Sequence, residues 1–284
     1  MDEDSLNQFL SINQILRKKV YSIQMPEAII LDLGSTLLNT YGKQEGRAFN
    51  FHYQSNGYHP LVCYDGITGD LIKIQLRDET QYSSTGVVDF LQPILDEYLE
   101  DFPEVKLLLR GDSGFATPGL YKQCEENGTD YVILLKENAI LRDKASYLLD
   151  ELDEIIKNNK VDYAMVYGEF IYQAGPWPYE RCVVCKVEKP ENQMTYMYTF
   201  VVTNMDSYPE YLIKFYCKRG LMENFIKESK TGFDFPSVSS HTMIAAKVIR
   251  SARYITFKLC SSCPYKDEFY ETLSNIGKLC IQLE

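Results

Sequence analysis

Apolar segments of strand length alternate with amphipathic helical segments in the first half of this chain, and their order limits the folds that it can adopt. Short apolar runs bounded by turn residues predict buried strands, and apolar residues at helical spacing predict helices. Strands are expected at 28–33, 57–64, 71–76, 105–109 and 131–135, and helices at 85–100 and 118–127. The chain therefore predicts an α/β sheet in which three strands come first and two further strands each follow a helix.

Asp112 stands close behind the predicted strand 105–109, in the sequence Gly-Asp-Ser-Gly. Ligands of open α/β sheets bind beyond the carboxyl ends of strands, which makes this carboxylate a candidate metal ligand. Aspartate beside glycine is also an ordinary turn residue, so a purely structural role is the alternative.

A second candidate is a stripe of four polar side chains in the last third of the chain. Arg219, Glu223 and Lys230 follow Tyr216 at offsets of 3, 7 and 14 residues. If one helix covers 205–230, about 100° per residue brings the four directions within roughly 60° of arc. Such a stripe could hold a metal ion and phosphates together. The alternative is a solvated helix face with charge pairs.

The same four residues form the pattern Tyr-x2-Arg-x3-Glu-x6-Lys, and with this signature the chain resembles the DDE-type transposases of bacterial insertion sequences. Segments 31–36 and 108–115 are similar to those around that family's first and second catalytic aspartates. The resemblance covers roughly residues 20–240. Together with the order of elements, it implies a ribonuclease H-like core with a mixed five-stranded sheet, interrupted by a β-rich insertion.

The expected organisation has five parts, given by composition and by this resemblance. They are a lead-in helix at 1–24, the first part of the core at 25–137, the β-rich insertion at 138–208, the last catalytic helix within 209–240, and a divergent C-terminal tail at 241–284.

The function that the resemblance implies is metal-dependent cleavage and strand transfer of DNA at the ends of a mobile element. Asp112 and Glu223 would bind Mg²⁺ or Mn²⁺ in a two-ion site, because carboxylates from separate elements anchor such ions. DNA contacts are expected from Tyr216, Arg219, Lys227 and Lys230. A homodimer within a transposition complex is a further expectation.

Gly34 is the main departure from this pattern. The first catalytic carboxylate is expected directly before Ser35 and Thr36, where this chain has glycine. Asp32 is the nearest acid and the third catalytic candidate, but two residues along a strand separate it from position 34 by about 6.5–7 Å. Its alternative role is that of a polar strand residue capped by Ser35 or Thr36. An impaired enzyme is therefore expected, and a non-catalytic DNA- or protein-binding module is the alternative function.

The net charge of −11 excludes DNA binding by bulk electrostatics alone. Any DNA contact must come from a local basic patch, for which 214–230 and 247–258 are the candidates.

Two C-x-x-C pairs, Cys182/Cys185 and Cys260/Cys263, allow a zinc interpretation, although their separation is far too large for a zinc ribbon. Free thiols in a reducing compartment are the alternative that we favour. The acidic N-terminus is unlike a signal peptide, and no apolar stretch has membrane-spanning length. A cytoplasmic protein that does not enter membranes is expected.

Overall fold

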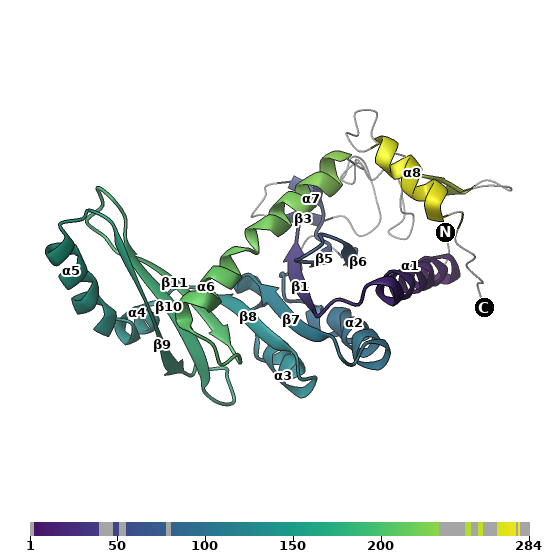
Figure 1. Ribbon diagram of the computed structural model, residues 1–284. Helices are drawn as coiled ribbons and strands as arrows, with labels where there is room; N and C mark the ends of the chain where they lie inside the picture. Colours follow the sequence, from purple (N-terminus) through teal and green to yellow (C-terminus); the bar gives the residue numbers. More distant parts are fainter. Residues whose placement is uncertain are drawn as a thin grey trace.

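The computed structural model describes residues 3–39, 48–50, 55–77, 81–232, 248–250, 255–257, 266–276 and 278. The largest sheet within them has eight strands in the order β6-β5-β1-β7-β8-β11-β10-β9 (Figure 1). Its strands are β1 (Ala28–Ser35), β5 (Leu61–Asp65), β6 (Leu71–Gln75), β7 (Lys106–Gly111), β8 (Asp130–Leu135), β9 (Ala164–Tyr172), β10 (Arg181–Lys189) and β11 (Met197–Thr203). The neighbours β1, β7 and β8 run parallel, and every other pairing in this sheet is antiparallel.

The sheet is wider than the five strands that the sequence predicts. Strands are indeed present in the predicted β-rich insertion, but they continue the same sheet, because β11 pairs with the outer edge of β8. An unpaired β8 would leave a row of backbone N–H and C=O groups without partners, and this pairing satisfies them. The molecule is therefore an α/β protein with one extended mixed sheet.

The predicted strand 57–64 is divided into two strands in different sheets. β4 (Ser55–Tyr58) pairs with β2 (Leu38–Asn39) and β3 (Ala48–Asn50), whereas β5 joins the large sheet. The break falls at His59 and Pro60, where proline lacks the N–H that a central strand would donate. A further small sheet is formed by β12 (Val248–Arg250) and β13 (Ile255–Phe257).

Helices cover both faces of the large sheet (Figure 1). One face packs against α2 (Val87–Asp101), α3 (Pro118–Glu126), α4 (Ala139–Lys144) and α5 (Tyr147–Asn159). The other face packs against α6 (Pro209–Cys217) and α7 (Gly220–Gly232). Because strand side chains alternate, Leu31 and Leu33 of β1 lie in the first core, and Asp32 and Gly34 face α6 and α7.

The single helix predicted for 205–230 is wrong, because α6 and α7 are separate helices that follow each other along the chain (Figure 1). Lys218 and Arg219 form a turn between them. The backbone bonds here span three residues instead of four, from Arg219 N to Tyr216 O at 2.9 Å and from Met222 N to Arg219 O at 2.9 Å. Tyr216 therefore belongs to α6, while Glu223 and Lys230 belong to α7.

The two chain ends carry the remaining helices. α1 (Glu3–Ile23) lies within the predicted lead-in segment and packs through Tyr21 on Tyr98 and Phe102. α8 (Lys266–Ile276) lies in the predicted tail. Cys260 and Cys263 lie outside the described residues, as does half of the basic segment 247–258. In the part of the chain that the structure describes, no helix is both long and apolar enough to cross a bilayer.

Candidate functional site

The carboxyl ends of β1 and β7 bring positions 34 and 112 to the same edge of the sheet. The two strands are parallel, with Asp32 level with Arg110, so that Gly34 and Asp112 follow two residues further along each strand. Asp112 leaves β7 and caps a 3-10 helix, η1 (Ser113–Phe115), where its Oδ1 accepts a hydrogen bond of 2.8 Å from Gly114 N. The predicted turn role of Asp112 is thus present, and its other oxygen remains available to a second partner.

That partner is Arg219. Its Nη2 donates to Asp112 Oδ2 at 3.2 Å and to the carbonyl oxygen of Leu33 at 3.0 Å. Its Nε is buried without a partner among the described residues. The turn between α6 and α7 thus places a guanidinium across the ends of both parallel strands, where it neutralises Asp112.

Met222 occupies the space above Gly34. A Cβ added to Gly34 would lie 2.6 Å from Met222 Cε and 3.2 Å from its Sδ. Met222 is fully packed against Val62 and Tyr64 of β5. Any side chain at position 34 would therefore have to displace a buried methionine, although the clash is with the flexible end of that side chain.

Asp32 faces the same side of the sheet but is fully engaged by Arg110. Arg110 donates to both carboxylate oxygens, from Nε at 2.6 Å and from Nη2 at 2.7 Å, and its Nη1 donates to the Phe215 carbonyl at 2.8 Å. Burial raises the pKa of Asp32, and the hydrogen bonds from Arg110 oppose that rise. The pair holds β1, β7 and α6 together, and it leaves no carboxylate oxygen of Asp32 without a donor.

The remaining residues of the predicted stripe lie on α7. Glu223 follows Arg219 by four residues, the spacing of neighbours on a helix surface, and Glu223 and Lys227 are both exposed. Lys230 is partly buried, and this desolvation lowers its pKa. Tyr216 ends α6 close enough to Asp112 and Glu223 to feel their charges, and burial raises the pKa of its phenol. Asp112, Tyr216, Arg219 and Glu223 are thus brought to one edge, with the two lysines further along α7.

A two-ion metal site does not fit the donor set at this edge. Position 34 has no side chain, Asp32 is held by Arg110, and Asp112 already accepts from Gly114 and Arg219. Across the described ranges, no group of three or more His, Cys, Asp or Glu side chains could hold a metal ion. Asp112 and Glu223 remain the candidate ligands, without the third carboxylate that two bridged ions require.

Cys182 and Cys185 lie on opposite faces of β10, as their offset of three residues predicts. Both are free thiols, so this C-x-x-C pair does not form a two-ligand metal clip.

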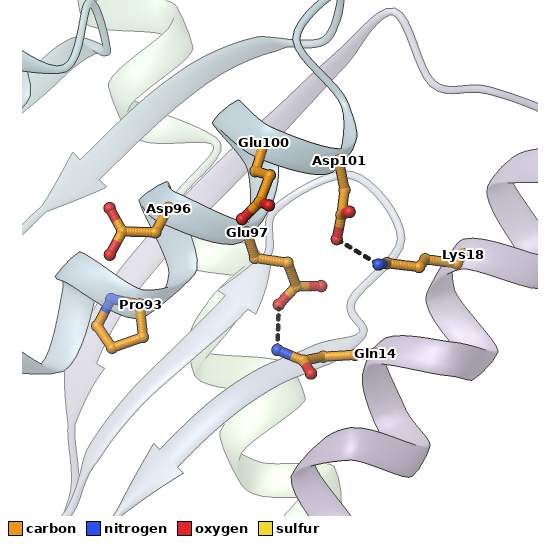
Figure 2. A pocket seen from close by; sticks show the side chains of 7 residues that line it. All are labelled: Gln14, Lys18, Pro93, Asp96, Glu97, Glu100 and Asp101. Carbon is orange, nitrogen blue, oxygen red and sulfur yellow. Dashed lines mark hydrogen bonds and ion pairs between the residues drawn. The ribbon is translucent and has the colours of Figure 1, made fainter. Parts of the chain in front are cut away.

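A pocket of about 360 Å³ between α1 and α2 is a separate feature (Figure 2). Its lining comprises Gln14, Lys18, Pro93, Asp96, Glu97, Glu100 and Asp101. Glu97 accepts from Gln14 at 3.3 Å, and Asp101 pairs with Lys18 at 2.7 Å. These acids attach α1 to α2, and we assign no ligand to the pocket.

Three residues of this edge were not anticipated from the sequence, namely Arg110, Met222 and Arg77. Arg110 had a readable signal, because a charged residue in the apolar run 107–111 requires a buried counter-charge. Met222 had none, since a methionine on an amphipathic helix is normally a core residue. Arg77 is discussed below.

The fold and site define an α/β protein with an arginine-neutralised carboxylate at the carboxyl ends of two parallel strands. Residues 1–245 match the model of the family Transposase DDE domain group 1, and the chain belongs to this family. The predicted relationship to DDE-type transposases is thereby confirmed.

Other comparisons add little detail. No curated protein matches the chain. It is similar to a solved piggyBac transposase in a synaptic complex with hairpin DNA, with a TM-score of 0.43 and 15% sequence identity. The match covers 81% of this chain and 48% of that chain, so this chain spans about half the length of that transposase.

Proposed function

We propose that this chain is a transposase-type, ribonuclease H-like domain that binds DNA at the edge formed by β1, β7 and α7 but does not cleave it. The ribonuclease H-like assignment is supported by the first five strands of the sheet. Their order is β6-β5-β1-β7-β8, with three antiparallel strands in sequence and two parallel ones added by helical crossovers. Family membership supports DNA as the ligand.

DNA binding would rest on Tyr216, Arg219, Lys227 and Lys230. Because the chain carries a net charge of −11, attraction must be local. Among the described residues Arg219 makes only a single contact to Asp112, and its buried Nε has no partner, so a phosphate oxygen would replace that carboxylate as the acceptor of Nη2. Lys227 and Lys230 continue the basic stripe along α7 and would contact further phosphates of the DNA backbone.

The absence of cleavage rests on one observation, the packing of Met222 over Gly34 beside an Asp112 that is already paired with Arg219. Activation of a nucleophile and stabilisation of a leaving oxygen by two ions need carboxylates from separate elements. Two acids, one of them bonded to arginine, are too few for that chemistry.

A metal-dependent transposase that uses Mg²⁺ or Mn²⁺ is the second candidate. It is favoured by the placement of Asp112 and Glu223 at one edge. It needs a third ligand, for which Asp32 would have to leave Arg110. A homodimer in a transposition complex belongs to either candidate as a further prediction.

The test combines DNA binding with plasmid nicking. Fluorescence anisotropy of a labelled duplex should show salt-dependent binding that weakens in Arg219→Gln and Lys227→Gln, each with a log–log salt slope lower by about 1. Lys157→Gln on α5, far from the edge (Figure 1), is the charge-matched control and should bind like the unaltered chain.

Supercoiled plasmid incubated with the chain and Mn²⁺ should remain intact. Nicking by the unaltered chain would establish the second candidate instead. Absence of any DNA binding at low salt would contradict both.

A further inference from the structure

The turn between β6 and α2 borders the same edge as Asp112. It reads Tyr-Ser-Ser-Thr-Gly over residues 82–86. Ser83 Oγ lies 3.1 Å from Ser35 Oγ at the end of β1, and a Cβ on Gly114 would lie 2.9 Å from Ser83 Cβ. The Ser83 hydroxyl thus contacts the end of β1, and Ser83 also lies against Gly114 in η1, just beyond the end of β7. None of its residues belongs to the predicted DNA-contact stripe.

Arg77 lies behind this turn as a buried cation. Arg77 is 8% exposed. Its Nη1 donates to the carbonyl oxygens of Tyr82 at 3.1 Å and Thr85 at 2.5 Å, and its Nε donates to the carbonyl oxygen of His59 at 3.0 Å. Among the described residues no carboxylate pairs with it, and its Nη2 is buried without a partner. Burial lowers the pKa of Arg77 to about 10, which still leaves it charged at neutral pH.

Among the described residues this buried charge has only carbonyl acceptors, and a buried charge without an opposite charge is costly, so the positive field of Arg77 favours an anion at the turn. The 15-residue helix α2 adds to this field. It starts at Gly86 without any side-chain cap. The N–H of Val87 donates to the Ser84 carbonyl at 3.2 Å, and the next N–H groups and the positive end of the helix dipole face the same turn. Buried arginine, hydroxyl groups and an uncapped helix start therefore converge on one place.

Of the carboxylates that the structure describes, two lie beside the turn and act in the opposite sense. Asp112 Oδ1 lies 2.9 Å from the Cβ position of Gly114, but Arg219 neutralises this carboxylate. Asp89 lies in the first turn of α2 and is exposed. The balance at the turn itself is set by Arg77 and the helix start against Asp89.

The remaining feature of the turn is an exposed aromatic ring, that of Tyr82, which is 84% exposed. We propose that the turn 82–86 binds one phosphate of a DNA strand and that Tyr82 stacks on the adjacent unpaired base. The site lies across Asp112 from Arg219, so a strand could contact the turn on one side and α7 on the other. This inference rests on the proposed DNA-binding function.

The experiment compares a blunt duplex with the same duplex carrying a short single-stranded tail, both read by anisotropy. Since base stacking contributes about 1–3 kcal/mol, Tyr82→Ser should lower affinity for the tailed duplex about fivefold or more and leave the blunt duplex within about twofold. Tyr208→Ser is the matched control, because Tyr208 is 85% exposed on α6 and away from the turn. It should not change either affinity.

A second variant should change DNA affinity in the opposite direction. Asp89→Asn removes the opposing charge and should strengthen binding of both duplexes about twofold. Inorganic phosphate, titrated by calorimetry, tests whether the turn binds the free anion as well as the DNA phosphate.

The results separate the two proposals. If Tyr82→Ser and Asp89→Asn bind both duplexes as the unaltered chain does while Lys227→Gln weakens binding, the turn site is wrong and the DNA-binding function stands. If phosphate binds but neither variant changes DNA affinity, the turn is a small-anion site that DNA does not contact, and the proposed phosphate and base contacts at the turn are wrong. If the unaltered chain binds no DNA, the proposed function itself fails.

Discussion

Two arginine–carboxylate pairs lie on the same face of the sheet, two residues apart along the strand direction. They differ in how exposed they are and in how completely their polar atoms are hydrogen-bonded. Asp32 and Arg110 are 0% and 1% exposed, and both carboxylate oxygens are bonded. The side chain of Asp112 is 39% exposed and meets Arg219 through a single contact of 3.2 Å. Arg219 also keeps a buried Nε without a partner in the described part of the chain.

The difference separates a structural pair from one that can exchange partners. In the first pair every donor and acceptor is satisfied inside the protein, so a ligand could gain nothing there without leaving a buried charge alone. In the second pair solvent reaches the carboxylate and the ionic contact contributes little to folding. Under the proposed function, a DNA phosphate would therefore compete for Arg219 but not for Arg110.

The largest expected effect comes from breaking the buried pair. Asp32→Asn leaves Arg110 buried with only a neutral partner, so the free energy of unfolding should fall by about 3–5 kcal/mol. Urea denaturation followed by circular dichroism measures it. Asp65→Asn, at another buried aspartate on the neighbouring strand that pairs with no arginine of the described residues, serves as the control and should lose less. A loss below about 1 kcal/mol for Asp32→Asn would remove the distinction between the two pairs.

The next effect concerns Gly34, which lies between the two pairs. Gly34→Asp must displace Met222 and should cost about 1–3 kcal/mol, as overpacked cores do. Met222→Ala should cost about 2–4 kcal/mol through its cavity. The double variant should lose less than the sum of the single variants, because the new carboxylate enters the space that Met222 leaves.

The control for this cycle is Gly175→Asp, where nothing lies within 4 Å of the added Cβ, and its change should stay within about 0.5 kcal/mol. Calorimetric titration of Mn²⁺ extends the cycle to ligand binding. The double variant should bind Mn²⁺ more tightly than Gly34→Asp alone. If the changes in the free energy of unfolding of the two single variants add up to that of the double variant, Met222 does not restrict the side chain at position 34.

Much of the sheet could be predicted because its central strands are formed by apolar runs that are visible in the local sequence. The apolar runs 28–33 and 131–135 fall within β1 and β8, and the run 105–109 overlaps β7 except at Val105. Asp112 could be placed at a strand end for the same reason. The pairing of β11 with β8 could not be predicted, because a strand about 65 residues downstream competes with solvent and with other partners for that edge of β8.

The details of the site were less predictable, since they depend on contacts between distant segments. Asp32 gives no sequence signal for choosing Arg110 over Ser35 or Thr36 as its partner. The division of α6 from α7 is equally hidden, because Cys-Lys-Arg-Gly contains no proline and its glycine is tolerated inside helices. Tertiary packing of Met222, Phe225 and Ile226 on β5 sets the direction of α7. Helical spacing alone therefore selected residues that lie on α6, on α7 and in the turn between them, but it did not give their arrangement.

The smallest expected effect tests the open pair. Asp112→Asn removes a partly exposed partner of Arg219, and stability should change by less than about 1 kcal/mol. DNA affinity should instead rise about two- to fivefold, because Arg219 is released and a negative charge beside the phosphate is lost. Asp150→Asn on α5 changes the net charge equally at a remote, exposed position and should leave affinity unchanged. If both variants raise affinity to the same extent, the effect is one of net charge, and Arg219 is not the group that exchanges Asp112 for DNA.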